Sequence, residues 1–187
     1  PTYEKIDPVR FIGNYSSGKM GYALAEECAS RGAEVVLVSG PVTLQAHHPN
    51  IRRVDVESAQ EMYEAAKEAF EDANAGILCA AVADFTPDHT ATHKIKREKD
   101  DLVLQLKPTQ DIAASLGATK KEGQTLVGFA LETNDEATNA QGKLERKNFD
   151  FIVLNSLNDK GAGFRVDTNK ITIIDREGAT PYPMKNK

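Results

Sequence analysis

The hydrophobic positions of the chain alternate between a helical period and a strand period. Met20, Leu24 and Cys28 are spaced four residues apart, which places them on one face of a helix predicted over 17–31. The Val-rich run 34–39 ends at a Gly-Pro pair and is typical of a buried strand. Further strands are predicted over 52–56, 76–82, 125–131, 151–154 and 170–174, and further helices over 58–73, 111–119 and 135–148.

This order of elements predicts a protein of the α/β class. Strands that alternate with helices of ten or more residues form βαβ units around a parallel sheet. Ser58 and Glu61 have the spacing of a capping box, which supports the start of the helix 58–73. We find no linker, internal repeat or low-complexity stretch, so we expect residues 1–187 to form a single domain.

The segment 84–107 interrupts the alternation. Strands are predicted over 94–97 and 102–106, joined by a turn at 98–101, and the second strand carries three leucines on one face. A two-stranded hairpin is marginally stable alone and needs a partner surface. Because symmetric dimers are the commonest oligomers, we expect the insertion to contribute to a homodimer.

Composition limits the classes of protein that fit. The chain of 187 residues is 40% hydrophobic and 27% charged, as in a globular domain, and its net charge of −5 argues against a nucleic-acid scaffold. It has no apolar run of the roughly 18 residues that a membrane helix needs, and no apolar leader near its start. Cys28 and Cys79 lie in apolar segments, which favours reduced thiols in the cytoplasm.

The loop 13–19 is the first candidate site. Two glycines, two serines and a lysine precede a helix, whose free N–H groups and dipole favour an anion. Residues 13–19 fit G-x-x-x-x-G-K, but Met20 stands where a P-loop has the Ser or Thr that binds magnesium. A phosphate-binding loop of another kind and a plain helix cap both remain open.

The strand end 80–85 is the second candidate. Small residues such as Ala80 and Ala81 allow a ligand to approach the backbone, and ligands of open α/β sheets bind at the carboxyl ends of strands. Asp84, which precedes Phe85, is suited to a sugar hydroxyl or to a metal on a triphosphate. A cap at the end of the strand would explain this aspartate equally well.

Cationic clusters make up the remaining candidates. They are Lys94, Lys96 and Arg97 in a predicted strand; Lys107, Pro108, Thr109 and Gln110 before a helix; and Lys143 with Lys147 on one helix face. Each cluster fits phosphate binding, but a solvated strand edge, a helix cap and a solvated helix face are alternative explanations.

Taken in order, these segments resemble bacterial phosphopantothenoylcysteine synthetases, the ligases of coenzyme A biosynthesis. The resemblance covers nearly the whole chain. Its motifs are D-P-V-R-F-I-G-N-Y-S-S-G-K-M-G from residue 7, A-A-V-A-D-F from 80, K-I-K-R from 94, V-G-F-A-L-E-T from 127 and K-x-x-x-K-N from 143.

The resemblance implies a Rossmann-like, three-layer parallel sheet with an inserted antiparallel hairpin used for dimerisation. It implies a CTP-binding ligase domain over 1–187, with 84–107 as a flap at the dimer interface and active site. The substrates would be 4′-phosphopantothenate and L-cysteine, with CTP as co-substrate and Mg²⁺ on its phosphates. A flavin-dependent decarboxylase, often fused upstream in the family, is an expected partner. Nucleic acids and membranes are not expected partners.

The resemblance also implies residue roles. Catalytic roles fall on Asn14, Lys94 and Arg10, and a nucleotide and metal role on Asp84. Nucleotide contacts fall on Ala80, Ala81, Phe85, Lys107, Pro108, Thr109, Gln110, Phe129, Lys143 and Lys147. The chain departs from the family at 108–110, where the family commonly has Lys-Asn-Pro. The family also has an apolar strand before the position of Pro1 and a closing helix, so we expect further residues at both ends.

Two other classes serve as alternatives. A Rossmann-type oxidoreductase or flavoprotein would need G-x-G-x-x-G, and Gly13, Gly18 and Gly21 do not have that spacing. A nucleotide-binding module without catalysis would bind CTP but release no pyrophosphate.

Overall fold

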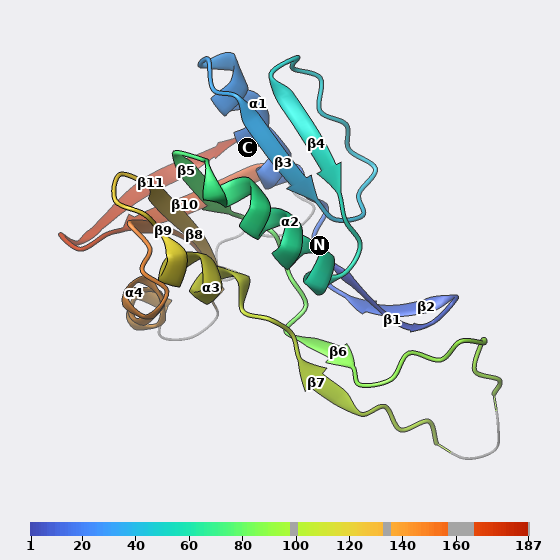
Figure 1. The fold of residues 1–187 in the computed structure, drawn as a ribbon. Coiled ribbons are helices and arrows are strands. Elements are labelled where there is room, and N and C mark those ends of the chain that lie inside the picture. Colours follow the sequence, from blue (N-terminus) through green and yellow to red (C-terminus); the bar gives the residue numbers. More distant parts are fainter. Residues whose placement is uncertain (98–100, 133–135, 157–166, 187) are drawn as a thin grey trace.

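The computed structural model describes residues 1–97, 101–132, 136–156 and 167–186 (Figure 1). The helices are α1 (Lys19–Ser30), α2 (Ala59–Glu71), α3 (Ile112–Thr119) and α4 (Glu136–Arg146). The strands are β1 (Tyr3–Asp7), β2 (Arg10–Gly13), β3 (Val35–Ser39), β4 (Ile51–Asp55), β5 (Ala75–Leu78), β6 (Phe85–Pro87), β7 (Leu106–Pro108), β8 (Thr125–Glu132), β9 (Phe151–Ser156), β10 (Thr168–Ile174) and β11 (Ala179–Asn186). The predicted α/β class is confirmed.

The main sheet has five strands in the order β11-β10-β9-β8-β5. Strands β5, β8 and β9 are parallel, with Ile77 opposite Val127 and Phe129 opposite Val153. Strands β10 and β11 are antiparallel to their neighbours, so the sheet is mixed, and the expectation of a purely parallel sheet is corrected. The sequence did not indicate β11, because Pro181 and Pro183 argue against a strand and only an edge strand tolerates them.

Strands β3 and β4 form a separate parallel pair, with Leu37 opposite Arg53. No hydrogen-bonded ladder joins β3 to β5 in the described part of the chain. Val36 on β3 and Ile77 on β5 consequently remain 39% and 42% exposed. The single continuous sheet that the sequence predicted is therefore divided in two.

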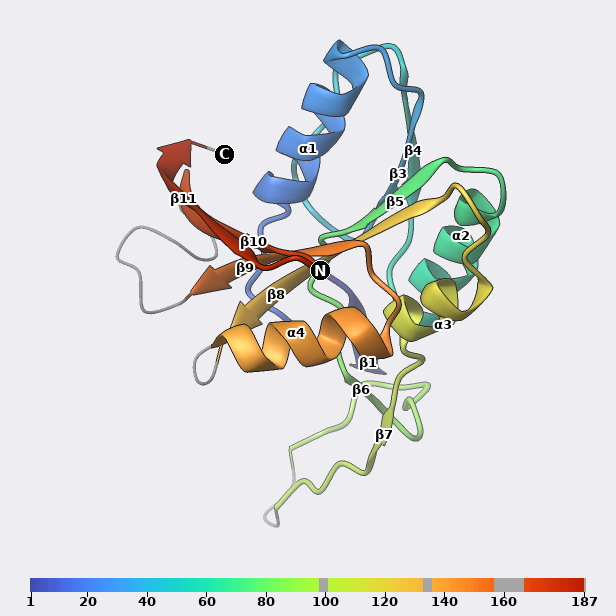
Figure 2. The same cartoon turned by 90° about the vertical axis from the view of Figure 1, so that its left-hand side faces the viewer.

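Helices α2, α3 and α4 share one hydrophobic core against the main sheet. Leu126, Leu144 and Ile152 are each at most 1% exposed and lie at its centre. Figure 2 shows α4 on one side of the strands and α1 on the other. The predicted capping box of α2 is present, since the Ser58 hydroxyl accepts a hydrogen bond from the Glu61 N–H at 3.2 Å and the Glu61 carboxylate accepts one from the Ser58 N–H at 3.2 Å.

The inserted segment differs from the prediction. Its antiparallel pair is β6 with β7, with Phe85 opposite Pro108, whereas 94–97 and 102–105 are not strands. The turn predicted at 98–101 lies mostly outside the described residues. Leu102 and Val103 are 55% and 82% exposed, because the segment extends away from the body and no sheet underlies it (Figure 1). We refer to residues 84–108 as the extension.

No described helix is both long enough and apolar enough to cross a lipid bilayer.

Candidate functional site

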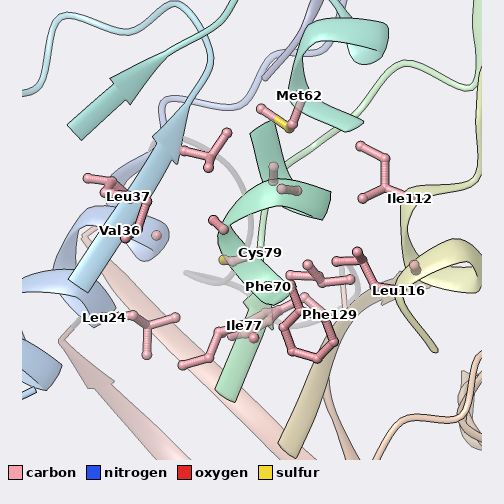
Figure 3. A pocket seen from close by; sticks show the side chains of 18 of the residues that line it. Leu24, Val36, Leu37, Met62, Phe70, Ile77, Cys79, Ile112, Leu116 and Phe129 are labelled. Atoms are coloured by element: carbon pink, nitrogen blue, oxygen red, sulfur yellow. The ribbon is translucent and has the colours of Figure 1, made fainter. Parts of the chain in front are cut away.

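A cavity of about 1940 Å³ lies between the main sheet and the β3–β4 pair. One region of it, the apolar trough, is bordered by side chains of β3, β5, α1 and α2, among them Val36, Ile77, Leu24 and Met62 (Figure 3). The other region, the polar mouth, gathers the candidate residues. It is lined by Asn14, Ser16, Ser17, Gly18, Lys19, Ala80, Ala81, Val82, Asp84, Thr109, Gln110, Asp111, Lys143, Lys147 and Asn155. Phe129, another predicted nucleotide contact, also lines the cavity and is labelled among the apolar side chains in Figure 3.

The amide of Asn14 joins the loop after β2 to the strand end after β5. Its Nδ2 donates hydrogen bonds to the carbonyl oxygens of Ala81 at 3.1 Å and Val82 at 3.2 Å. These two candidates of the sequence, one from each motif, therefore meet at the polar mouth.

The loop 80–84, which follows β5 and was predicted in part as strand, is held by two threonines. The Ala83 N–H donates to the hydroxyl of Thr2 at 3.0 Å, and the Thr109 hydroxyl donates to the carbonyl of Ala83 at 2.7 Å. The Thr109 N–H also donates to the carbonyl of Asp84 at 2.9 Å. The side chain of Asp84 is exposed at the mouth, on a backbone fixed from both sides.

The N-terminus of α1 faces the same region. Gly18 has φ +80°, and its N–H donates to the Ser16 hydroxyl at 3.3 Å. Lys19 forms an ion pair with Asp167, with 2.5 Å between Nζ and Oδ1. The loop follows the largely exposed strand β2, not a buried strand, which argues further against a P-loop.

Lys143 on α4 and Lys147, which directly follows the end of this helix, both line the mouth. The Nζ of Lys147 lies 3.1 Å from Oδ2 of Asp111, the N-cap of α3. Partial burial raises the pKa of Asp111, but the Ala114 N–H and the Lys147 ammonium outweigh it, so this pKa lies below its ordinary value. The carboxylate thus stays ionised and holds Lys147 beside the cavity.

A glycine sets how closely Lys147 approaches α3. A Cβ at Gly117 would lie 2.0 Å from the carbonyl oxygen of Lys147, so no larger residue fits there without a backbone shift. The Asn148 side chain donates to the Gly117 carbonyl at 3.0 Å and fixes the same contact.

Other predicted site residues lie outside the cavity. Lys94 is exposed on the extension, Phe85 is 52% exposed, and Lys107 pairs with Asp88 at 3.5 Å between Nζ and Oδ1. Pro108 pairs with Phe85 across β6 and β7, and Arg10 binds Asp7. Their roles remain predictions.

Sequence reasoning gave no role to Thr2 or Asn155, and it left Asp111 open between an anion site and a cap at the start of a helix. Asn155 donates to Asn169 at 3.1 Å and lines the cavity near the end of β9. Its position at the end of a buried strand is the same signal that indicated Asp84. Thr2 and Asp111 act through contacts with distant residues, which the sequence pattern does not carry.

Comparisons with known proteins agree with this geometry. The family model described as the DNA/pantothenate metabolism flavoprotein C-terminal domain matches residues 1–187. The chain belongs to this family, and the resemblance seen in its motifs is confirmed at that level.

Two curated relatives are informative. A cysteine/cysteine sulfinic acid decarboxylase from an unknown prokaryotic organism is 62% identical over 176 residues, which are 94% of this chain and 49% of that protein. The coenzyme A biosynthesis bifunctional protein CoaBC of Bacillus subtilis (strain 168) is 48% identical over 178 residues, which are 95% of this chain and 44% of that protein. The chain thus spans about half the length of these relatives.

Solved structures show the same fold. The C-terminal domain of a coenzyme A biosynthesis bifunctional protein CoaBC has a TM-score of 0.80 at 41% identity, covering 98% of this chain and 82% of that one. A Cab2 mutant in complex with phosphopantothenate-cysteine has a TM-score of 0.78 at 16% identity, covering 97% and 77%, and supports the fold alone.

Proposed function

We propose that this domain joins 4′-phosphopantothenate to L-cysteine, with CTP cleaved to CMP and pyrophosphate. The observation that carries the proposal is the polar mouth, where Asn14, Asp84, Lys143 and Lys147 line one cavity next to the N-terminus of α1. Membership of the family and the similarity to CoaBC proteins support the choice of substrates.

The first step activates the acid. A carboxylate oxygen of phosphopantothenate attacks the α-phosphorus of CTP and forms an acyl-cytidylate, and pyrophosphate leaves with the electron pair of the broken P–O bond. Lys143, Lys147 and the N–H groups at the start of α1 are suited to stabilise the charge that develops on the phosphates.

The second step forms the amide. The amine of cysteine attacks the acyl carbon, CMP leaves with the electron pair of the broken C–O bond, and the amine loses a proton to the leaving phosphate or to water. Asn14 is suited to orient the acyl phosphate, since an amide offers both a donor and an acceptor. No nucleophile of the protein is needed.

Magnesium fits this donor set as an ion carried by the nucleotide. Among the described residues, no three His, Cys, Asp or Glu side chains gather into a metal site. Magnesium commonly keeps several waters and takes one or two carboxylates together with phosphate oxygens, so Asp84 would suffice. The ion would neutralise charge on the triphosphate.

The extension fits a homodimer in which Lys94 reaches the nucleotide of the second copy. Phe85, Leu102, Val103 and Leu106 are 52%, 55%, 82% and 46% exposed, and such apolar surface is stabilised when a partner covers it. Sedimentation at micromolar concentration tests this, and a monomer would contradict it.

The longer relatives suggest where the substrates come from. They are about twice the length of this chain, and CoaBC is described as bifunctional, which supports a fused or associated flavin-dependent decarboxylase as partner. One relative is named a decarboxylase, but this chain matches only 49% of that protein. The name therefore does not assign decarboxylation to this domain.

We place the reaction in the cytoplasm, where CTP and cysteine occur.

The test is pyrophosphate release with phosphopantothenate and each of the four ribonucleoside triphosphates, without cysteine. Release with CTP supports the ligase and its base preference. Pyrophosphate release with another triphosphate instead would show that CTP is not the co-substrate. A protein that binds a triphosphate but releases pyrophosphate from none of the four is better explained as a non-catalytic module.

A further inference from the structure

A buried carboxylate connects the start of the chain to the extension. Asp7 ends β1, and its side chain is 0% exposed. Its Oδ1 accepts hydrogen bonds from the N–H groups of Val9 at 2.9 Å and Arg10 at 3.0 Å. Its Oδ2 accepts from Nε and Nη2 of Arg10 and, at 3.1 Å, from the N–H of Ile95.

Both backbone polar groups of Ile95 are bound by this pair. Its N–H is bound by Asp7, and its carbonyl accepts a hydrogen bond from Nη2 of Arg10 at 2.7 Å. Because Lys94 directly precedes Ile95, the backbone next to Lys94 is held by a carboxylate far away in the sequence.

Two neighbouring contacts tie the same stretch to β1. The Thr90 hydroxyl donates to the carbonyl of Lys5 at 3.0 Å, and the Ala91 N–H donates to that of Ile6 at 2.9 Å. The other strand of this hairpin, β2, leads directly to Asn14 at the mouth. The β1–β2 hairpin therefore joins the mouth to the extension.

We infer that Asp7 is a positioning residue for the activation step, which acts by fixing Ile95 and hence Lys94. This inference rests on the proposed function, in which Lys94 meets the nucleotide. Charge-assisted hydrogen bonds and a two-pronged guanidinium contact give more geometric definition than a single neutral bond. A misplacement of about 1 Å at a reacting group costs on the order of a hundredfold in rate.

Asp7→Asn tests the inference, with Glu4→Gln as the matched control. Glu4 is also a buried carboxylate of β1, 4% exposed, but it accepts from the Ala59 N–H at 2.8 Å at the start of α2. Asp7→Asn should lower kcat for pyrophosphate release by on the order of 10- to 100-fold with little change in KM for CTP. Glu4→Gln should lower stability without this loss of kcat.

The double variant Asp7→Asn/Lys94→Gln separates positioning from general support. If Asp7 acts through Lys94, the double variant is as slow as Lys94→Gln alone. The inference is overturned if the kcat losses of the two single variants multiply in the double variant. It is also overturned if Asp7→Asn and Glu4→Gln lose kcat equally. Should Asp7→Asn fail to fold by circular dichroism, Arg10→Lys removes the two-pronged contact and must show the same dependence on Lys94.

Amide exchange of Ile95 gives a readout that does not need activity. The N–H of Ile95 should exchange faster in Asp7→Asn than in wild type, and at the wild-type rate in Glu4→Gln. Unchanged exchange in Asp7→Asn overturns the inference. If wild-type protein releases no pyrophosphate from any triphosphate, the proposed function fails, while this exchange measurement still decides whether Asp7 fixes the segment.

Discussion

The core of the main sheet and the β1–β2 hairpin with the extension are stabilised in different ways. In the core, Leu126, Leu144 and Ile152 are almost wholly buried among other apolar side chains. In the hairpin and extension, polar contacts such as those of Asp7 provide the attachment, while Phe11 and Leu102 are 50% and 55% exposed. The hydrophobic effect is non-directional, whereas hydrogen bonds depend on the direction between donor and acceptor. The first region gives stability, and the second holds the backbone of the extension in a defined direction.

Leu126→Ala should have the largest effect on stability. The side chain is 0% exposed, and removing it from a packed core costs about 3 kcal/mol in the free energy of unfolding. Denaturant titration measures the loss.

Leu102→Ala is the counterpart on the extension. Because Leu102 is 55% exposed, the free energy of unfolding of the monomer should change by less than about 0.5 kcal/mol. If the proposed homodimer forms, its dissociation constant should increase. An equal loss of unfolding free energy in both variants would remove the contrast between the two regions.

Lys94→Gln should reduce pyrophosphate release about a hundredfold, as expected when one charge contact to a transferring phosphoryl group is lost. Its stability should stay close to that of wild type, because the side chain is exposed. Lys96→Gln and Arg97→Gln are the controls. Similar small losses in all three variants would mean that the segment is only an electropositive edge.

Asn14→Asp should slow the second step about tenfold, equivalent to roughly 1.4 kcal/mol of lost orientation. The carboxylate would face the carbonyl oxygens of Ala81 and Val82, to which the amide now donates. Rapid quench should show acyl-cytidylate that accumulates when cysteine is present. Normal turnover would exclude Asn14 from the chemistry.

Asp150→Asn should reduce the acid-sensitive part of the free energy of unfolding by about 1 kcal/mol, the net contribution of a typical hydrogen bond. Partial burial raises the pKa of Asp150, but the Leu126 N–H and Lys120 lower it more, so the folded-state pKa lies below the ordinary value of about 3.9. A carboxyl group with a lowered pKa stabilises the fold when the pH lies above the ordinary pKa. This stabilisation is lost as the pH falls through the folded-state pKa.

Acid titration followed by circular dichroism should therefore show a shallower loss in Asp150→Asn than in wild type. Asp55→Asn serves as control, since the side chain of Asp55 is 71% exposed in its ion pair with Arg53. Equal slopes in wild type and Asp150→Asn would show that this carboxylate does not contribute.

Periodicity predicted the parts of the fold that burial decides. The helix after Ser58 and the strands 125–131 and 151–154 were predicted within one or two residues, because their apolar patterns match what they bury. The hairpin at 94–106 was wrong, because alternating leucines indicate a strand only where a sheet lies beneath them.

The candidate site was predictable where motifs end strands or begin helices. Asn14 and Asp84 follow predicted strands, and both line the cavity. Lys147, which also lines it, was a candidate for a different reason, its spacing of four residues from Lys143. Asp7 and Thr2 were not found, since their partners, Ile95 and Ala83, are more than eighty residues away in the chain. No local pattern records such pairings.

The two prolines of β11 bear on how copies of the protein can polymerise. This strand ends the five-stranded sheet, and Pro181 and Pro183 offer no N–H to an incoming strand. An edge without regular donors is a poor template for growth by strand addition, the route by which sheets assemble into fibrils. Replacing both prolines with threonine would restore those donors, so the variant should form thioflavin-positive aggregates faster than wild type at equal concentration.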